Sequence, residues 1–349
     1  MIIFLAVATT VWNLLASSTS AFAPIQKTAI TKYDNHSYQQ PSTLFVEARE
    51  NIKSLSWQAI SDLPPVHLTL IMPAYNEEFR IRETLFHYGN YISSSEVWGR
   101  DHGAWCDIVV VDDGSTDGTA NMVLECDQLI KGVHLHCISL EKNEGKGSAV
   151  ARGIDFVYQR HMDRSEDSGC VILVADADGS GDIAYLNTMM SQLSQSVERF
   201  TVNERKLSSA TSSIAHPWKT KAVVVGNRAG NTSPSRIITR WGFQTLVKII
   251  CGNLQVNDTQ CGFKLMTIDA GLTLYSNLNL KRWTHDVEVL FRAKQLNIPV
   301  TEVNIGWEDK EGSKLASNVS ETITVSGKML AEITKMRLQY LMKRWIVVE

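Results

Sequence analysis

Runs of apolar residues alternate with segments of helical periodicity along most of this chain of 349 residues. The run from Val171 to Val174 leaves no polar face, which is typical of a strand buried on both sides. Further strands are expected at 67–75, 107–111, 133–140 and 222–228, and helices at 77–85, 117–131, 145–160 and 234–254. This alternation predicts an α/β fold, with a mostly parallel central sheet and helices on both faces.

The two ends of the chain and one internal segment have different patterns. Residues 1–23 are apolar but short for a membrane span, and they are interpreted as a signal anchor or a signal peptide. Residues 24–65 are polar and irregular, as in a linker. Within the domain expected at 66–327, residues 194–221 are rich in Ser, Thr and Lys and are expected to form a flexible insertion. Residues 328–349 are expected to contain a basic amphipathic helix, which would lie on a membrane surface or pack on the domain.

Composition and charge narrow the class of protein. A formal net charge of −3 argues against nonspecific nucleic-acid binding. The six cysteines form no Cys-x-x-Cys pair and are expected to be reduced thiols, which favours a reducing compartment. Lys27 and Lys32 follow the apolar N-terminal segment and no Lys or Arg precedes it, so an uncleaved segment would leave the body of the protein in the cytosol. The alternative is a cleaved presequence for the secretory pathway or a plastid.

Paired carboxylates follow two of the expected strands. Asp176 and Asp178 come directly after the strand at 171–174, and Asp112 and Asp113 end the strand at 107–111. Carboxylates one residue apart can share a divalent cation, and oxygen ligands favour Mg²⁺ or Mn²⁺. Ligands of open α/β sheets bind beyond the carboxyl ends of the strands. The two pairs therefore predict a site for a nucleotide diphosphate.

A series of motifs gives the chain a family resemblance. The segments are, in order, PAYNEE, VVDDGSTDGT, NEGKGSAVARG, ADADGS, VGNRAG, DTQCGFKL and RWTHDVEVL. In these segments the chain resembles the family 2 glycosyltransferases of GT-A (Rossmann-like) fold. Within them it is similar to the branch that transfers glucose from UDP-glucose to dolichyl phosphate, with inversion, for the assembly of N-glycan precursors. The resemblance covers roughly residues 66–345 and implies a catalytic domain on the cytosolic side of the endoplasmic reticulum membrane.

The resemblance also implies roles for individual residues. Those implied in donor binding are Ala74, Tyr75, Asn76, Glu77, Asp112, Lys146 and Asp176. Those implied in binding Mg²⁺ or Mn²⁺ are Asp176, Asp178 and Ser180, of which Ser180 is the weaker ligand. The residues implied in catalysis are Asp178, Arg228 and Asp258, with Asp258 acting as a base or only orienting other groups. Those implied in binding the phosphate or the acceptor are Arg228, Arg236, Arg240, Lys264, Asp286 and Glu288.

Alternatives remain open for the function and for single residues. One is a sister enzyme that uses another nucleotide sugar, such as GDP-mannose. Another is a catalytically silent protein that binds nucleotide sugars. At the level of residues, the alternatives are an exposed turn lysine at Lys146, a structural ion pair at Arg228, and a packing role for Trp283, His285 and Val287.

Overall fold

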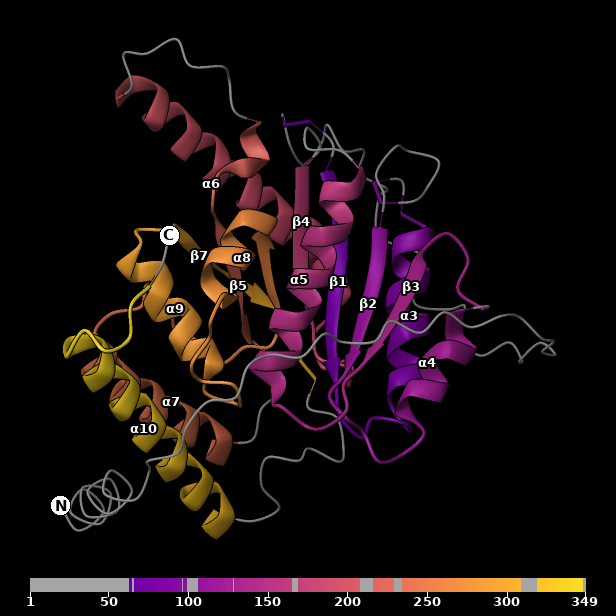
Figure 1. The fold of residues 1–349 in the computed structure, drawn as a ribbon. Coiled ribbons are helices and arrows are strands. Elements are labelled where there is room, and N and C mark those ends of the chain that lie inside the picture. Colours follow the sequence, from indigo (N-terminus) through magenta and orange to yellow (C-terminus); the bar gives the residue numbers. More distant parts are fainter. Residues whose placement is uncertain are drawn as a thin grey trace.

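A seven-stranded sheet forms the centre of the protein in the computed structural model, in the order β3-β2-β1-β4-β6-β5-β7 (Figure 1). Residues 63–64, 66–95, 97–98, 106–127, 129–164, 169–207, 216–228, 234–308 and 319–347 are described. The strands are β1 (Val66–Ala74), β2 (Cys106–Asp112), β3 (His134–Ser139), β4 (Gly169–Val174), β5 (Val223–Arg228), β6 (Lys264–Thr267) and β7 (Val300–Ile305). Neighbouring strands pair in parallel, except that β6 runs antiparallel to β4 and β5. The expected mostly parallel α/β fold is confirmed.

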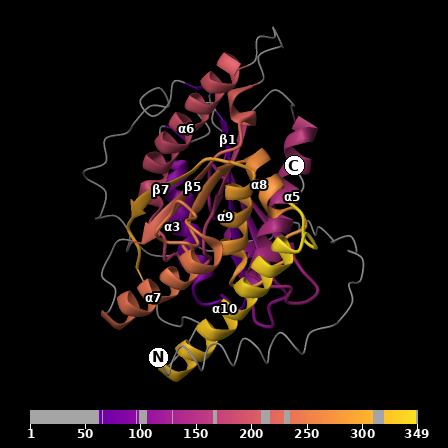
Figure 2. The same ribbon diagram turned by 90° about the vertical axis from the view of Figure 1, so that its left-hand side faces the viewer.

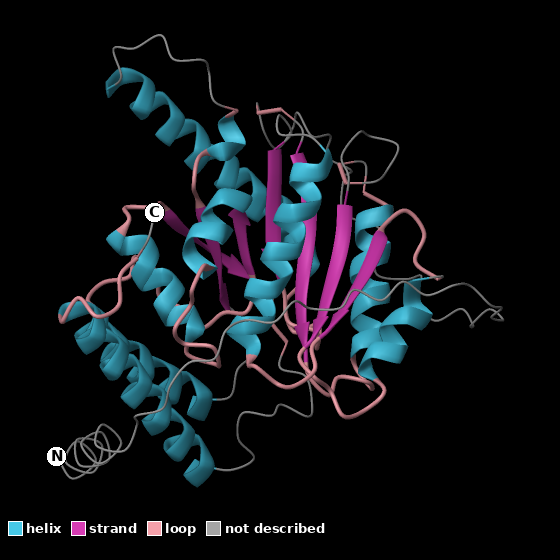
Figure 3. Cartoon of the chain, viewed as in Figure 1, coloured by secondary structure: helices cyan, strands magenta, loops and turns pink. Residues whose placement is uncertain are grey.

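Helices cover both faces of the sheet, as expected. The longer ones are α3 (Ile81–Ser93), α4 (Thr119–Asp127), α5 (Lys146–Arg164), α6 (Leu186–Leu207), α7 (Pro234–Cys251), α8 (Ile268–Tyr275), α9 (His285–Gln295) and α10 (Val319–Leu341). Figure 2 shows α3 and α6 on one side of the sheet and α5, α8 and α9 on the other. The helices α7 and α10 pack against each other near one end of the molecule (Figure 3).

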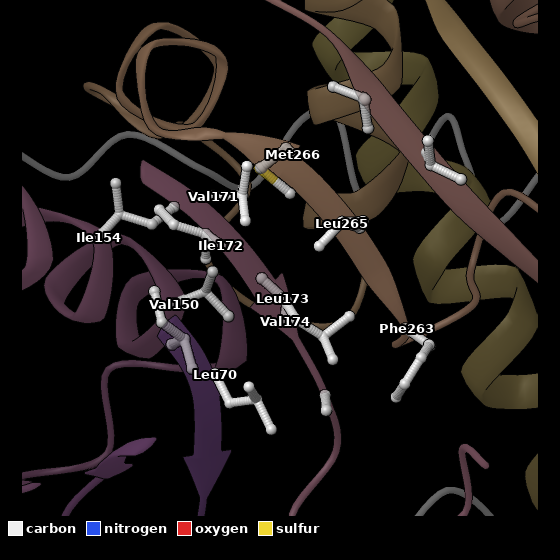
Figure 4. Packing of buried hydrophobic residues seen from close by; sticks show 14 of the residues in the cluster. Leu70, Val150, Ile154, Val171, Ile172, Leu173, Val174, Phe263, Leu265 and Met266 are labelled. Atoms are coloured by element: carbon white, nitrogen blue, oxygen red, sulfur yellow. The ribbon is translucent and has the colours of Figure 1, made fainter. Parts of the chain in front are cut away.

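The core lies around the central strand β4. All of its residues are buried, including the whole run from Val171 to Val174 (Figure 4). Val150 and Ile154 of α5 are buried in the same cluster. At Gly153 a Cβ atom would lie 2.5 Å from Ile71, so glycine allows α5 to approach the sheet closely. Each fully buried aliphatic side chain contributes about 1.5–3 kcal/mol, which explains why the apolar runs predict this part of the fold.

The expectation of a flexible insertion at 194–221 is wrong for its first half. Residues up to Leu207 belong to α6, and 217–219 form a short 3₁₀ helix whose Trp218 is buried. The helix is held by buried apolar residues at helical spacing, namely Leu186, Met189, Met190, Leu193 and Val197. Most of these residues precede position 194. The segment after it is rich in Ser, Thr and Lys, so its composition gave no sign that the helix continues. Residues 208–215 lie outside the described part of the chain.

The C-terminal helix packs on the domain, which was one of its two expected positions. Leu330, Ile333 and Met336 of α10 are buried, and Arg337 lies 5.3 Å from the centroid of the Phe291 ring. The helix ends at Leu341, earlier than the sequence suggested. Among the described residues, none of the helices combines the length and apolarity needed to cross a bilayer. The N-terminal segment 1–23 and nearly all of the expected linker lie outside those residues.

A buried carboxylate ties α9 to its neighbours. Glu288 is fully buried and accepts hydrogen bonds from the Leu280 amide at 2.6 Å and from the Tyr340 hydroxyl at 2.8 Å. Arg292 lies 2.9 Å from the same carboxylate and also donates to the carbonyl groups of Ser276 and Asn277 at the end of α8. These hydrogen bonds and the ion pair with Arg292 offset the desolvation cost of burying the carboxylate. Helices α8, α9 and α10 are thereby joined at one point.

Candidate active site

The loops after β1 and β2 are bonded to each other at the carboxyl edge of the sheet. Asn76 adopts φ 52°, and its amide donates to Ser115 Oγ at 2.8 Å while its side-chain oxygen accepts from the Thr116 amide at 2.8 Å. The Glu77 amide donates to Thr119 Oγ1 at 2.8 Å. Of the expected donor-binding residues, Asn76 and Glu77 therefore fix the shape of this edge. Ala74 beside them is buried, whereas Tyr75 is exposed.

Asp112, the last residue of β2, and Asp113, which follows it, have different surroundings. Asp112 Oδ1 accepts a hydrogen bond from the Ser115 amide at 3.0 Å. Asp113 accepts from the amides of Glu144 and Gly145, at 2.7 and 2.8 Å. Burial raises the pKa of Asp113, although these two amides oppose the shift. Asp113 thus holds the turn that carries Lys146, a role that the sequence did not assign to it.

Lys146 and Asp176 form an ion pair across the site. Lys146 Nζ lies 2.5 Å from Asp176 Oδ1, so the start of α5 is bonded to the end of β4. Burial works to lower the pKa of Lys146, but Asp176 and Asp286 outweigh it and raise that pKa. Gly262 lies against the Asp176 carboxylate, where a Cβ atom would clash with both of its oxygens. The structure therefore brings together two of the residues expected to bind the donor.

Asp178 is the second carboxylate of this edge. Its Oδ1 accepts from the Ser180 amide at 3.0 Å, and its Oδ2 lies 3.9 Å from Arg80, which in turn pairs with Glu77 at 2.6 Å. Arg80 was not predicted from the sequence. Its position three residues after Glu77 in a helical turn is the signal that could have identified it.

Asp176 and Asp178 are the residues that could hold a divalent cation at this edge. Their side chains are 23% and 25% exposed, so neither is sealed in the core. Ser180 is buried, and its carbonyl accepts from the Glu308 amide, which fastens this loop to the segment after β7. Within the described parts of the chain, no group of three or more His, Cys, Asp or Glu side chains could hold a metal. Two carboxylates leave positions for water and diphosphate oxygens, as is usual for Mg²⁺.

Arg228 and Asp258 form a bidentate pair at the end of β5. Arg228 Nε and Nη2 donate to the Asp258 oxygens at 2.6 and 2.7 Å, and the guanidinium lies 5.3 Å from the centroid of the Trp307 ring. Burial alone would lower the pKa of Arg228, but its hydrogen bonds and charge interaction with Asp258 raise it. Asp258 is 1% exposed, and Glu302 accepts a hydrogen bond from its amide. This geometry favours an orienting role for Asp258 rather than that of a base.

Lys264, Asp286 and His285 form a second buried cluster. Lys264 Nζ lies 2.7 Å from Asp286 Oδ1 and donates to the Cys261 carbonyl. His285 Nε2 lies 3.1 Å from the same Asp286 oxygen. Burial would raise the pKa of Asp286, but His285 and Lys264 hold it well below its usual range. Lys264 and Asp286 thus pair with each other beside Lys146, and neither side chain is exposed.

Of the other expected acceptor residues, only Glu288 has a described side chain, and it lies away from this cluster. Glu288 belongs to the network that joins α8, α9 and α10. Arg236 and Arg240 lie on α7, and their side chains are outside the described part of the chain. The exposed Trp283, by contrast, lies at the site, where Lys146 Nζ is 5.9 Å from the centroid of its ring.

Comparisons with known proteins agree with the motifs. Residues 69–209 match the sequence model of the family described as "Glycosyl transferase family 2". The chain is 32% identical over 290 residues to the dolichyl-phosphate beta-glucosyltransferase of Mus musculus, covering 82% of this chain and 80% of the mouse protein. It is 32% identical over 281 residues to the protein of the same name from Saccharomyces cerevisiae, covering 79% and 76%. Glucosyl-3-phosphoglycerate synthase from Mycobacterium tuberculosis superposes with a TM-score of 0.45 at 15% identity, over 78% of this chain and 80% of that chain.

The two types of carboxylate at this edge should respond differently to neutralisation. Asp258→Asn removes the charge opposite a buried guanidinium and is expected to lower the free energy of unfolding by about 3 kcal/mol. Asp178→Asn keeps the acceptor for the Ser180 amide at a partly exposed position, and should change it by less than about 0.5 kcal/mol. Denaturant unfolding of both variants measures the difference. Equal effects would contradict the structural assignment of Asp258.

Proposed function

Because this chain belongs to the family 2 glycosyltransferases, among the dolichyl-phosphate β-glucosyltransferases, we propose that it transfers glucose from UDP-glucose to dolichyl phosphate with inversion. The observation that carries the proposal is the arrangement of Asp176, Asp178 and Lys146 at the carboxyl edge of the sheet, with Arg228 at the end of β5. This set of charges suits a diphosphate. The names of the relatives supply the sugar and the lipid acceptor.

The residues of the chain would divide the work between donor and acceptor. Negative charge develops on the β-phosphate as the glucosyl group leaves, and preorganised cations stabilise that charge. Lys146 and Arg228 are the candidates, because each is already aligned by a carboxylate. A phosphate monoester is largely ionised near pH 7, since its second pKa is about 6, and it needs no strong base. This agrees with Asp258 having both of its oxygens engaged by Arg228. Direct attack by the acceptor oxygen on the anomeric carbon inverts that centre.

Asp176 and Asp178 would hold Mg²⁺ or Mn²⁺. A divalent cation bound there would add positive charge to the leaving diphosphate. Asp178 is pre-positioned by the Ser180 amide, and the Arg80 guanidinium lies 3.9 Å from its carboxylate. Lys146 already lies against Asp176, so cation, lysine and diphosphate would meet at one carboxylate.

The acceptor is a lipid, so we also propose that the protein works at the cytosolic face of the endoplasmic reticulum membrane. The apolar segment 1–23 would serve as an anchor. Exposed apolar residues at and after the end of α10, among them Leu341, Met342 and Ile346, lie beside Lys343 and Arg344, a combination that suits a lipid surface.

A donor-by-acceptor assay tests the reaction. Purified protein with Mg²⁺ and dolichyl phosphate is offered UDP-glucose and GDP-mannose in parallel. Glucosyl transfer from UDP-glucose alone is expected, with a β-linked product by NMR. Mannosyl transfer alone would indicate the sister activity. Binding of both nucleotides without turnover would indicate a silent nucleotide-sugar-binding protein.

Neutralising the cation site should remove activity while the fold persists. Asp178→Asn is expected to lower kcat by at least about 10²-fold, because charge stabilisation of the leaving diphosphate is lost. Mn²⁺ binding in the presence of UDP, followed by electron paramagnetic resonance, should weaken in parallel. Asp127→Asn, an exposed aspartate at the end of α4, is the matched control and should change neither measurement. Full activity of Asp178→Asn would rule out this cation site.

Protease protection tests the location. In sealed microsomes that contain the full chain, protease added from outside should digest the catalytic domain. A protected domain would place the protein in the lumen and contradict the cytosolic assignment.

A further inference from the structure

His285 is a fully buried histidine at the first position of α9. A Cβ atom on Gly147 would lie 2.6 Å from His285 Cβ, so the side chain is packed against the start of α5. On its other side the ring of Tyr275 lies 6.1 Å away between ring centroids. The charged and titratable groups around it are Asp286 on α9, Lys264 on β6, Lys146 on α5 and Tyr275 on α8.

Both ring nitrogens of His285 face acceptor oxygens. Nδ1 lies 2.8 Å from the carbonyl oxygen of Arg282, which can only accept, so Nδ1 carries a proton. Nε2 lies 3.1 Å from Asp286 Oδ1, at ion-pair distance although not aligned as a hydrogen bond. A neutral ring with its proton on Nδ1 would place an electron-rich, unprotonated Nε2 only 3.1 Å from this carboxylate oxygen. Only the imidazolium form avoids that repulsion in a buried site.

This charge changes the balance around Asp286. The same oxygen, Asp286 Oδ1, faces Lys264 at 2.7 Å and His285 at 3.1 Å, so one carboxylate faces two buried cations. Lys146 is close enough to Asp286 for an electrostatic interaction between the two charges. Its ammonium nevertheless lies 2.5 Å from Asp176, which is expected to bind the donor. Two cations on Asp286 weaken its attraction for a third. Without the imidazolium, Asp286 would compete with Asp176 and the diphosphate for Lys146.

We propose that His285 is a buried imidazolium and a positioning residue, which saturates Asp286 and so keeps Lys146 directed toward the donor diphosphate. The proposal rests on the proposed function for the role of Lys146. The protonated state of His285 does not depend on that function.

Nitrogen NMR of ¹⁵N-histidine-labelled full chain tests the protonation directly. The His285 signals, assigned by their loss in His285→Asn, should show two protonated ring nitrogens at pH 7. A non-protonated Nε2 would overturn the proposal, whether or not the protein transfers glucose. This measurement uses the wild-type chain, so it stands even if the variants fold poorly.

Kinetics of two variants test the positioning role. His285→Asn keeps a donor near the Arg282 carbonyl, and His285→Phe keeps the ring volume, but both lack the charge. Each should raise the KM for UDP-glucose about tenfold, the size expected for one lost charge interaction among partly shielded groups, with the KM for dolichyl phosphate unchanged and kcat within about twofold.

His134→Asn, at an exposed histidine on β3, should leave all constants unchanged. If folded His285→Asn and His285→Phe keep the wild-type KM for UDP-glucose, His285 only packs and the positioning role is wrong. If wild-type protein shows the imidazolium but transfers no glucose, the proposed function fails and the protonation stands.

Discussion

The ion pair between Lys146 and Asp176 joins the two parts of the site. It connects the start of α5, which follows strands β1 to β3 in the chain, with the end of β4, beyond which the sheet continues with β6 and β5. Each neighbouring charge is balanced in turn, Asp286 by Lys264 and Asp258 by Arg228. A buried charge without a partner would cost several kcal/mol. The position of each charged side chain at this edge therefore limits where its partner can lie.

This mutual constraint explains why small residues recur around the charged ones. Gly262 leaves room for the Asp176 carboxylate, and Gly147 leaves room for His285. At Gly145 the backbone has φ 101°, a conformation that suits glycine, and a Cβ atom there would clash with the Lys281 carbonyl. The turn that carries Lys146 is therefore fixed by Asp113, by the Lys281 carbonyl and by His285. A site built in this way is largely preorganised, which is what electrostatic stabilisation of a leaving diphosphate requires.

Much of the architecture was predictable from local patterns. The apolar run at 171–174 has no polar face, so it had to be a central strand, and the aspartates after it had to lie at the carboxyl edge. Residues 194–207 were not predictable in this way, because a polar stretch continues a helix whose apolar anchors lie earlier. Asp258 was expected to act in catalysis and Glu288 in acceptor binding, but a carboxylate in the sequence does not reveal whether an arginine faces it.

The sequence by itself determined the α/β class, the positions of the carboxylate pairs and the family, because apolar period and motif order are local properties of the chain. Only the tertiary structure decided which charges pair, since partners such as Lys146 and Asp176, or Lys264 and Asp286, are distant along the chain. The choice between a charged and a packing role for His285 also depends on the tertiary structure, which places its ring nitrogens 2.8 and 3.1 Å from acceptor oxygens. That distinction depends on which oxygens face the ring, and those oxygens are brought there by folding.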